Sequence, residues 1–185
     1  MHTMNQLLAA LAVFSMVTVA AAHERIAVLD DCDATDPTWA PIGDCLLEGG
    51  DVTRTEFDTL LLSPLSLATI GHPSWRNDPA YLTIGPDVMV RVTNKGGRDH
   101  TFTEVAAFGG GRVPGLNVGV TLAPECALAA GAPDPTALRP GASLDVTGLG
   151  VGLHHFQCCI HPWMRAAIKV NAPEPDEDDD EDDQD

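Results

Sequence analysis

The chain has 185 residues and a formal net charge of −17, from 27 acidic residues against ten basic ones. This length fits one domain with extensions and is sufficient to bury a substantial core. A chain this acidic offers nothing to replace the counterions of phosphate groups, so we expect no nucleic-acid partner. Ten of the acidic residues lie in 174–185, a segment without any base.

Residues 1–22 have the pattern of a secretory signal peptide. An apolar run from Leu7 to Ala22 ends in small residues, although the segment before it contains His2 and neither Lys nor Arg. The run is short for a membrane span. We therefore expect an exported protein, periplasmic or secreted, with a mature chain that begins near His23 and carries no membrane segment.

Residues 23–64 form an N-terminal extension in this interpretation. Cys32 and Cys45 flank a loop containing Asp, Pro and Trp, and two such cysteines in an exported chain most simply form a disulfide. Farther along, Thr53 precedes an apolar pattern and is followed three residues later by Glu56. This is a capping-box pattern, and it predicts a short helix with Thr53 as its N-cap.

Residues 65–171 consist of short β-branched runs separated by Gly, Pro and Asn. This texture predicts an all-β fold, a Greek-key antiparallel β-sandwich. The predicted strands are 65–71, 80–85, 88–94, 100–107, 142–148, 152–158 and 164–170. Glycines and prolines between 109 and 141 indicate a long surface loop. The composition of residues 172–185 predicts a disordered acidic tail.

A thiol, an imidazole and a thioether lie within seven residues near the end of this region. They belong to Cys158, His161 and Met164, with two residues between successive members. A tight turn after a strand would point all three at one place. Soft sulfur with imidazole selects copper, and a His, His, Cys plane with a long axial Met is the blue-copper electron-transfer site. His100, delivered by the turn 94–99, is the candidate for the second histidine.

The motif Cys158-x-x-His161-x-x-Met164 resembles the copper loop of the cupredoxins in its short, amicyanin-like form. Three upstream segments are also similar to this family: Tyr81–Ile84, Val88–Asn94 and His100–Thr103. The resemblance extends over residues 65–171. It implies a cupredoxin domain of the plastocyanin or azurin kind, preceded by the N-terminal extension and followed by the acidic tail.

The resemblance also implies a metal centre with one copper ion per chain, cycling between Cu(I) and Cu(II). Cys158 would bind as a thiolate, His100 and His161 through neutral nitrogens, and Met164 as the weak axial ligand. Methionine argues against zinc as the metal. In many cupredoxins Asn follows the first histidine. Here Thr101 follows it, which leaves open which side chain braces the ligand loop.

The function implied is that of a monomeric electron carrier rather than an enzyme, passing single electrons between redox partners outside the cytoplasm. In the family, a redox protein docks transiently where the second histidine nears the surface, a place bordered here by Pro162 and Trp163. A mononuclear copper redox enzyme, with an open position if Met164 does not bind, is the alternative. A copper-binding or carrier protein is another.

Five cysteines leave one unpaired. Spacing favours Cys158 over Cys159 as the ligand, and strand parity agrees, because Cys158 shares the face of Phe156. Cys159 would then pair with Cys126. An alternative joins Cys126 to one of the two N-terminal cysteines, and a Cys158–Cys159 disulfide would abolish the metal site.

Three further histidines compete for the ligand role. His154 shares the inward parity of Phe156 and Cys158, so we expect a packed histidine there. We expect His155 to be exposed and His72 to be a loop residue.

Overall fold

The computed structural model describes residues 23–62 and 73–174 of the chain. The predicted signal peptide, the predicted strand 65–71, His72 and most of the acidic tail lie outside these residues. Within the described ranges, no helix has the length and apolar character needed to cross a membrane.

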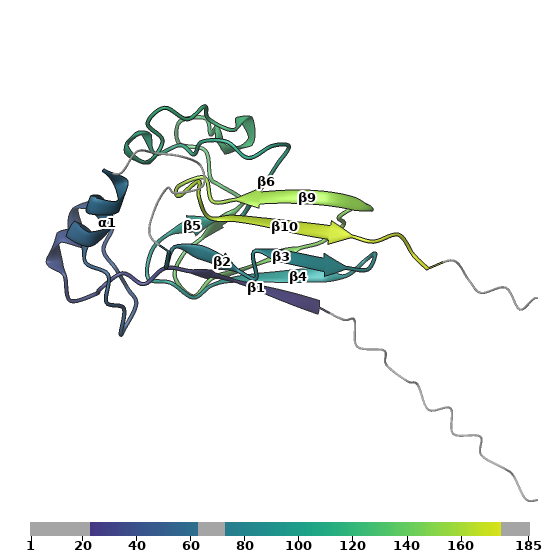
Figure 1. Ribbon diagram of the computed structural model, residues 1–185, viewed down its shortest axis with the longest axis horizontal. Helices are drawn as coiled ribbons and strands as arrows, with labels where there is room; N and C mark the ends of the chain where they lie inside the picture. The colour runs from purple at the N-terminus through teal and green to yellow at the C-terminus, as the bar shows by residue number, and fades with distance from the viewer. Residues whose placement is uncertain (1–22, 63–72, 175–185) are drawn as a thin grey trace, which may run out of the picture.

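Two four-stranded sheets form the body of the protein (Figure 1). The first sheet has the order β2 (Arg76–Asp78), β1 (His23–Leu29), β4 (Met89–Asn94) and β8 (Ser143–Val146). The second has the order β3 (Tyr81–Ile84), β10 (Arg165–Val170), β9 (Gly152–Gln157) and β6 (Thr103–Val105). A separate short pair joins β5 (His100–Thr101) to β7 (Ala137–Leu138).

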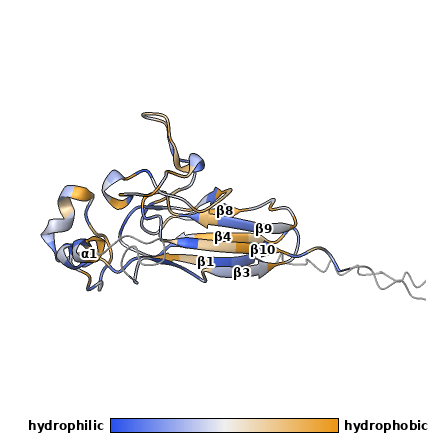
Figure 2. Ribbon diagram, turned by 45° about the horizontal axis from the view of Figure 1, so that its top comes forward, coloured by the Kyte–Doolittle hydropathy of each residue, from blue (hydrophilic) through white to orange (hydrophobic). Residues whose placement is uncertain are grey.

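The core lies between the two sheets, because each strand turns alternate side chains inward. Val28 of β1 and Val92 of β4 come from the first sheet, and Phe156 of β9 and Ile168 of β10 come from the second. All four are almost completely buried and belong to one apolar cluster. Hydrophobic and hydrophilic colouring accordingly mix along the strands (Figure 2). The predicted β-sandwich is confirmed.

The sheets are mixed rather than purely antiparallel as the sequence led us to expect. β1 runs parallel to β4, and β3 runs parallel to β10. Parallel neighbours need long connections, and each of these pairs is separated by many residues of chain. Side-chain periodicity reveals which residues face inward but not the direction of the neighbouring strand, so the pattern could not disclose these pairings.

Strand β1 comes from residues 23–64, the segment that the sequence analysis assigned to an extension. It pairs with β2 on one side and with β4 on the other. Only Ile26 and Val28 carry the inward pattern, and two apolar positions give a weak strand signal. The sandwich therefore includes chain upstream of residue 65, and the domain boundary at residue 65 stays a prediction.

The rest of the N-terminal segment lies beyond one end of the strands and carries the 3-10 helix η1 (Pro37–Ile42) and helix α1 (Arg54–Leu61). The Thr53 hydroxyl accepts a hydrogen bond from the Glu56 amide at 3.2 Å, which confirms the predicted N-cap. The predicted disulfide between Cys32 and Cys45 is also present.

The long loop after β6 contains two 3-10 turns, η2 (Pro114–Leu116) and η3 (Pro124–Cys126). The predicted disulfide between Cys126 and Cys159 fastens this loop to the segment after β9. Val105 and Ala123 pack around that disulfide in a second apolar cluster. The loop and α1 gather at the end of the sandwich where β9 turns into β10 (Figure 1).

Candidate metal centre

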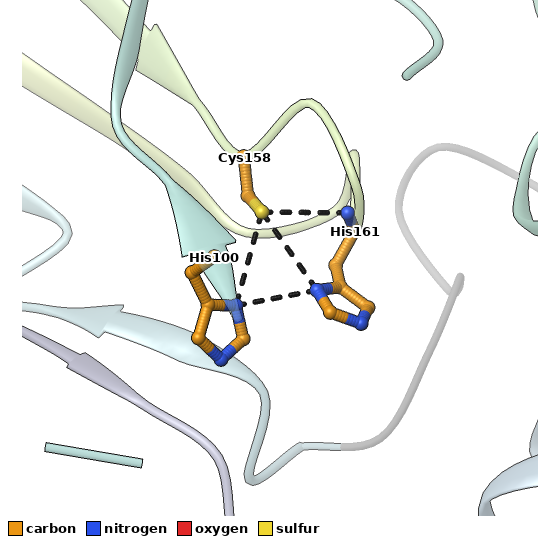
Figure 3. Close-up of side chains that lie close together, drawn as sticks. All are labelled: His100, Cys158 and His161. Carbon is orange, nitrogen blue, oxygen red and sulfur yellow. Dashed lines mark hydrogen bonds between the residues drawn. The ribbon is translucent and has the colours of Figure 1, made fainter. Parts of the chain in front are cut away.

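Three of the four predicted ligands meet at this end of the sandwich. His100 lies in β5, Cys158 directly follows β9, and His161 lies in the turn before β10. The Cys158 Sγ is 3.8 Å from Nδ1 of His100 and 3.7 Å from Nδ1 of His161, and the two nitrogens are 3.2 Å apart (Figure 3). In the described part of the chain, no other group of His, Cys, Asp and Glu side chains converges in this way.

These spacings fit one small metal ion at the centre of the triangle. Metal bonds of ~2.0–2.1 Å to nitrogen and ~2.3 Å to sulfur in a trigonal plane separate two nitrogens by roughly 3.6 Å, and sulfur from nitrogen by roughly 3.8 Å. The sulfur-to-nitrogen distances match, and the nitrogen pair is slightly closer. Two imidazoles with one thiolate suit copper.

Met164 closes the turn that carries the other two downstream donors. Its amide donates to the His161 carbonyl at 2.9 Å, and its carbonyl accepts from the Cys158 amide at 2.9 Å. The Met164 side chain is completely buried. These backbone bonds fix the turn, whereas axial ligation by Met164 stays a prediction.

The surroundings of Cys158 favour its thiolate form. Burial raises the pKa of a thiol, but hydrogen bonds with His100 and His161 outweigh burial and hold the pKa of Cys158 well below its usual value. The Thr101 and His161 amides also point at the sulfur, each at 3.4 Å. Since the thiolate is the metal-binding form, the pocket prepares Cys158 as a ligand.

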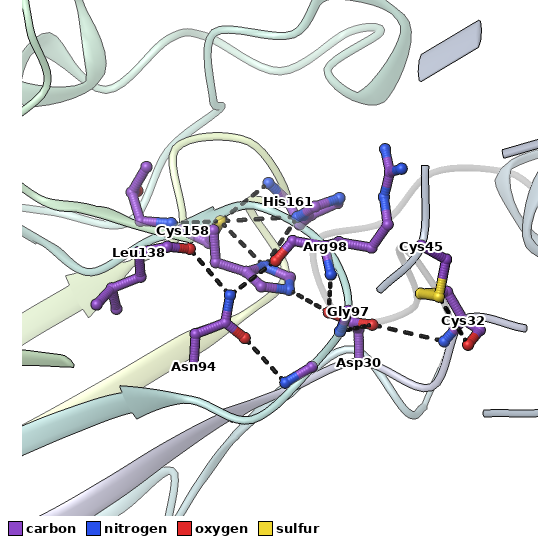
Figure 4. Close-up of polar contacts among 12 residues, drawn as sticks. Asp30, Cys32, Cys45, Asn94, Gly97, Arg98, Leu138, Cys158 and His161 are labelled. Carbon is purple, nitrogen blue, oxygen red and sulfur yellow. Dashed lines mark hydrogen bonds and ion pairs between the residues drawn. A yellow bond between two sulfur atoms is a disulfide. The ribbon is translucent and has the colours of Figure 1, made fainter. Parts of the chain in front are cut away.

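Thr101 is the side chain that braces the two ligand segments. Its hydroxyl oxygen accepts a hydrogen bond from the Cys159 amide at 2.7 Å. The sequence had left this role open, because Thr101 stands where many cupredoxins have Asn. On the other side of the site, Asn94 donates to the carbonyls of Arg98 and Leu138 and so fixes the turn before His100 (Figure 4).

Asp30 is a contact of the site that the sequence analysis missed. Its Oδ2 lies 2.7 Å from Nε2 of His100, and both side chains are fully buried. Burial opposes a charge on either group. The mutual hydrogen bond nevertheless lowers the pKa of Asp30 and, together with Cys158, raises the pKa of His100 to about 9. A metal at Nδ1 must therefore displace a proton from the metal-free site.

His161 lies beneath the N-terminal segment and is only 5% exposed. Its ring packs edge-on against Phe57 of α1 and against Trp163, with centroid separations of 6.4 and 5.4 Å. Burial lowers the pKa of His161 despite its bond to Cys158, which favours a neutral imidazole. A cavity of about 310 Å³ between α1 and the η2 turn includes His161 in its wall.

His154 and His155 do not join the cluster. His154 lies opposite the core residue Ile168 of β10, as its inward parity predicted, and pairs with Glu104 at 2.7 Å and with the Gly150 carbonyl at 2.8 Å. His155 was expected to be exposed but is half-buried, because its ring packs edge-on against Phe108 at 4.7 Å. These contacts hold both side chains away from the cluster of His100, Cys158 and His161.

No family model matches the chain, and no curated protein matches it either. Several solved structures are similar to it. A purple cupredoxin from Nitrosopumilus maritimus has 14% identity and a TM-score of 0.42, covering 80% of this chain and 99% of its own. A reduced single-site mutant of amicyanin has 16% identity and a TM-score of 0.36, covering 54% of this chain and 77% of its own.

The two-sheet architecture of the chain is that of a β-sandwich. The fit to a blue-copper ligand set rests on the cluster of His100, Cys158 and His161 itself.

Proposed function

We propose that this protein is a type 1 copper protein that carries single electrons between redox partners outside the cytoplasm. The observation that carries the proposal is the buried cluster in which the Cys158 sulfur and the Nδ1 atoms of His100 and His161 all lie within 4.8 Å of one another. One thiolate and two imidazoles are the equatorial donors of a blue-copper site. One copper ion per chain, with Met164 as axial ligand, completes the proposal.

Copper in this place supplies a one-electron couple between Cu(II) and Cu(I). The protein's task is to hold the donors in one arrangement for both oxidation states. His100 is held in the β5–β7 pair. Cys158 and His161 are held by the turn bonds to Met164. A site on such rigid elements needs little rearrangement when the charge changes.

We further propose that a redox protein exchanges electrons at the His161 side of the site, near Pro162 and Trp163. Trp163 is half-buried and contacts the His161 ring at a centroid distance of 5.4 Å, which supports a short route outward. Pro162 is buried, so the contact would involve its surroundings more than its own ring. Such encounters are small and transient, and the carrier itself would remain monomeric.

Export of the chain, with removal of residues 1–22, belongs to the same proposal. Two disulfides support an oxidising compartment, because such bonds persist there and are rare in the cytoplasm. Mass spectrometry of the protein recovered from a periplasmic or culture fraction should give an N-terminus near His23. An N-terminus at Met1 would contradict export by this signal.

The first experiment titrates the copper-free mature protein with Cu(II) while visible absorption and paramagnetic resonance are recorded. We expect an intense thiolate-to-copper band that saturates at one copper per chain and disappears in Cys158→Ser. The matched control is the double variant Cys126→Ser and Cys159→Ser, which removes two other sulfurs and should keep the band. Absence of the band in the unmodified protein, or its survival in Cys158→Ser, would overturn the proposal.

A mononuclear copper redox enzyme is the second candidate. The observation that favours it is the cavity of about 310 Å³ beside His161, which lies at the lower end of the range for small-molecule sites. An enzyme would turn over a small substrate repeatedly, whereas a carrier would react once per copper. Stopped-flow reduction followed by steady-state assays with small inorganic and phenolic substrates separates the two.

A further inference from the structure

Asp30 is the only acidic residue that is buried among those the structure describes. It follows β1 directly and reaches His100, which is 70 residues away in the chain. A buried carboxylate is unfavourable unless it is paired and hydrogen-bonded. The contacts of Asp30, and that with His100 in particular, must therefore offset the cost of burying its charge.

Both oxygens of the carboxylate are occupied by donors from the turn that precedes His100. Oδ1 accepts the Gly97 amide at 2.9 Å, and Oδ2 accepts the Arg98 amide at 3.0 Å together with Nε2 of His100 at 2.7 Å. The turn approaches so closely that a Cβ on Gly96 would overlap Oδ2. Asp30 thus fixes the turn and the ring together.

An ionised carboxylate only accepts hydrogen bonds, so Nε2 of His100 must carry the proton. Once the ring is neutral, as a metal ligand must be, its lone pair is on Nδ1, the atom that faces Cys158 and His161. His161 is different. No described group pairs with its Nε2, and its ring forms part of a cavity wall. The two imidazoles of the site are therefore held unequally.

We propose that Asp30 is a positioning residue of the copper centre, which fixes the tautomer and orientation of His100 and, through the imidazole, stabilises Cu(II) relative to Cu(I). Carboxylates that accept from a ligating histidine raise the basicity of that ligand. A more basic ligand favours the higher charge on the metal. This inference rests on the proposed copper function. It also gives the N-terminal segment a part in the metal centre that the copper-loop motif does not contain.

The test compares Asp30→Asn with Asp145→Asn. The second variant removes the same charge from the exposed pair that Asp145 of β8 forms with Arg91 of β4. We expect Asp30→Asn to bind copper 10- to 100-fold more weakly. We also expect its Cu(II)/Cu(I) equilibrium to shift at least tenfold toward Cu(I), which raises the reduction potential by ~59 mV or more. Asp145→Asn should keep both values. A copper-binding Asp30→Asn with unchanged potential and affinity would overturn the assignment.

A second measurement does not depend on the variant folding or on copper chemistry. The unmodified protein is loaded with Zn(II), which also binds thiolate and imidazole, and its histidine ring nitrogens are followed by ¹⁵N NMR. We expect a slowly exchanging proton on Nε2 of His100 and metal on Nδ1. A rapidly exchanging Nε2 proton, or metal on Nε2, would overturn the inference. Absence of the blue band from the unmodified protein and from both Asp variants would instead refute the copper proposal. The tautomer of His100 in the zinc-loaded protein would not be affected by that outcome.

Discussion

The Cys159 amide donates a hydrogen bond of 2.7 Å to the Thr101 hydroxyl oxygen. Thr101 follows His100 and Cys159 follows Cys158, so this one bond ties the segment of the first ligand to the segment of the second. Both partners are buried, and the bond is shielded from water.

Thr101→Val should loosen this connection with little change of shape. The variant leaves the buried Cys159 amide without its acceptor, at a cost of about 1–3 kcal/mol in the free energy of unfolding. We expect a shifted visible spectrum as well, because the two ligand segments lose their common anchor. Denaturant titration and copper absorption measure both effects. Thr101→Ser keeps the hydroxyl and should stay near the unmodified protein; equal losses in both variants would assign the effect to packing.

Substitutions of Met164 should move the reduction potential in opposite directions. Met164→Gln offers a harder oxygen donor that favours Cu(II), and so lowers the potential. Met164→Leu removes the thioether and should raise it. Each tenfold change in the Cu(II)/Cu(I) equilibrium corresponds to ~59 mV, which a redox titration resolves. Shifts of the same sign in both variants would argue against axial ligation by Met164.

The Cys126–Cys159 disulfide should contribute to stability without contributing to the copper spectrum. It closes a sequence separation of 33 residues, for which the chain-entropy model gives about 3–4 kcal/mol. The double variant Cys126→Ser and Cys159→Ser should lose that amount in chemical denaturation while copper absorption persists. Single Cys126→Ser leaves a free thiol beside Cys158 and should yield mixed copper species. A double variant of unchanged stability would contradict the prediction.

Removal of residues 23–64 should prevent folding. The deletion takes away β1, which pairs along both of its edges and buries Ile26 and Val28. Near-ultraviolet circular dichroism and NMR dispersion of the truncated chain provide the measurement. Deletion of 175–185, most of the predicted acidic tail 172–185, is the control and should leave both signals in place. A folded chain without residues 23–64 would show that the sandwich does not need β1.

Glu104→Gln should lower the pKa of His154. In the unmodified protein the hydrogen bond to Glu104 raises the pKa of this histidine, with help from the Gly150 carbonyl. The stabilisation is complete below the unfolded value of ~6.5 and disappears as pH rises through the folded value. The Glu104 side chain is half exposed, so solvent screens the pair and its effect on stability is small. NMR titration of the ring protons gives the pKa directly, and an unchanged value would contradict the assigned cause.

The parts of the site that the sequence predicted are those held by short-range geometry. Cys158 and His161 are separated by two residues, so a tight turn brings them together with few alternatives. The free thiol at Cys158 also followed from local pattern, since Cys159 points to the other side of the strand and meets Cys126. The N-cap at Thr53 is local in the same sense.

The parts that escaped prediction depend on contacts between distant segments. Asp30 stands in an acid-rich run beside Asp31, where no feature of the sequence separates a buried carboxylate from a solvated one. Its role becomes visible only when parallel pairing of β1 with β4 brings it to the turn before His100. The half-burial of His155 similarly depends on Phe108 in the long loop.

The two disulfides impose an order on the maturation of the metal centre. All five cysteines are thiols when the chain is synthesised, and Cys159 stands next to the one that is free in the folded protein. Copper that arrived at that stage would find two adjacent sulfurs and distribute itself between them. Once Cys159 is bonded to Cys126, a single thiol remains to receive the ion. Oxidation of the chain must therefore precede metallation for a uniform product.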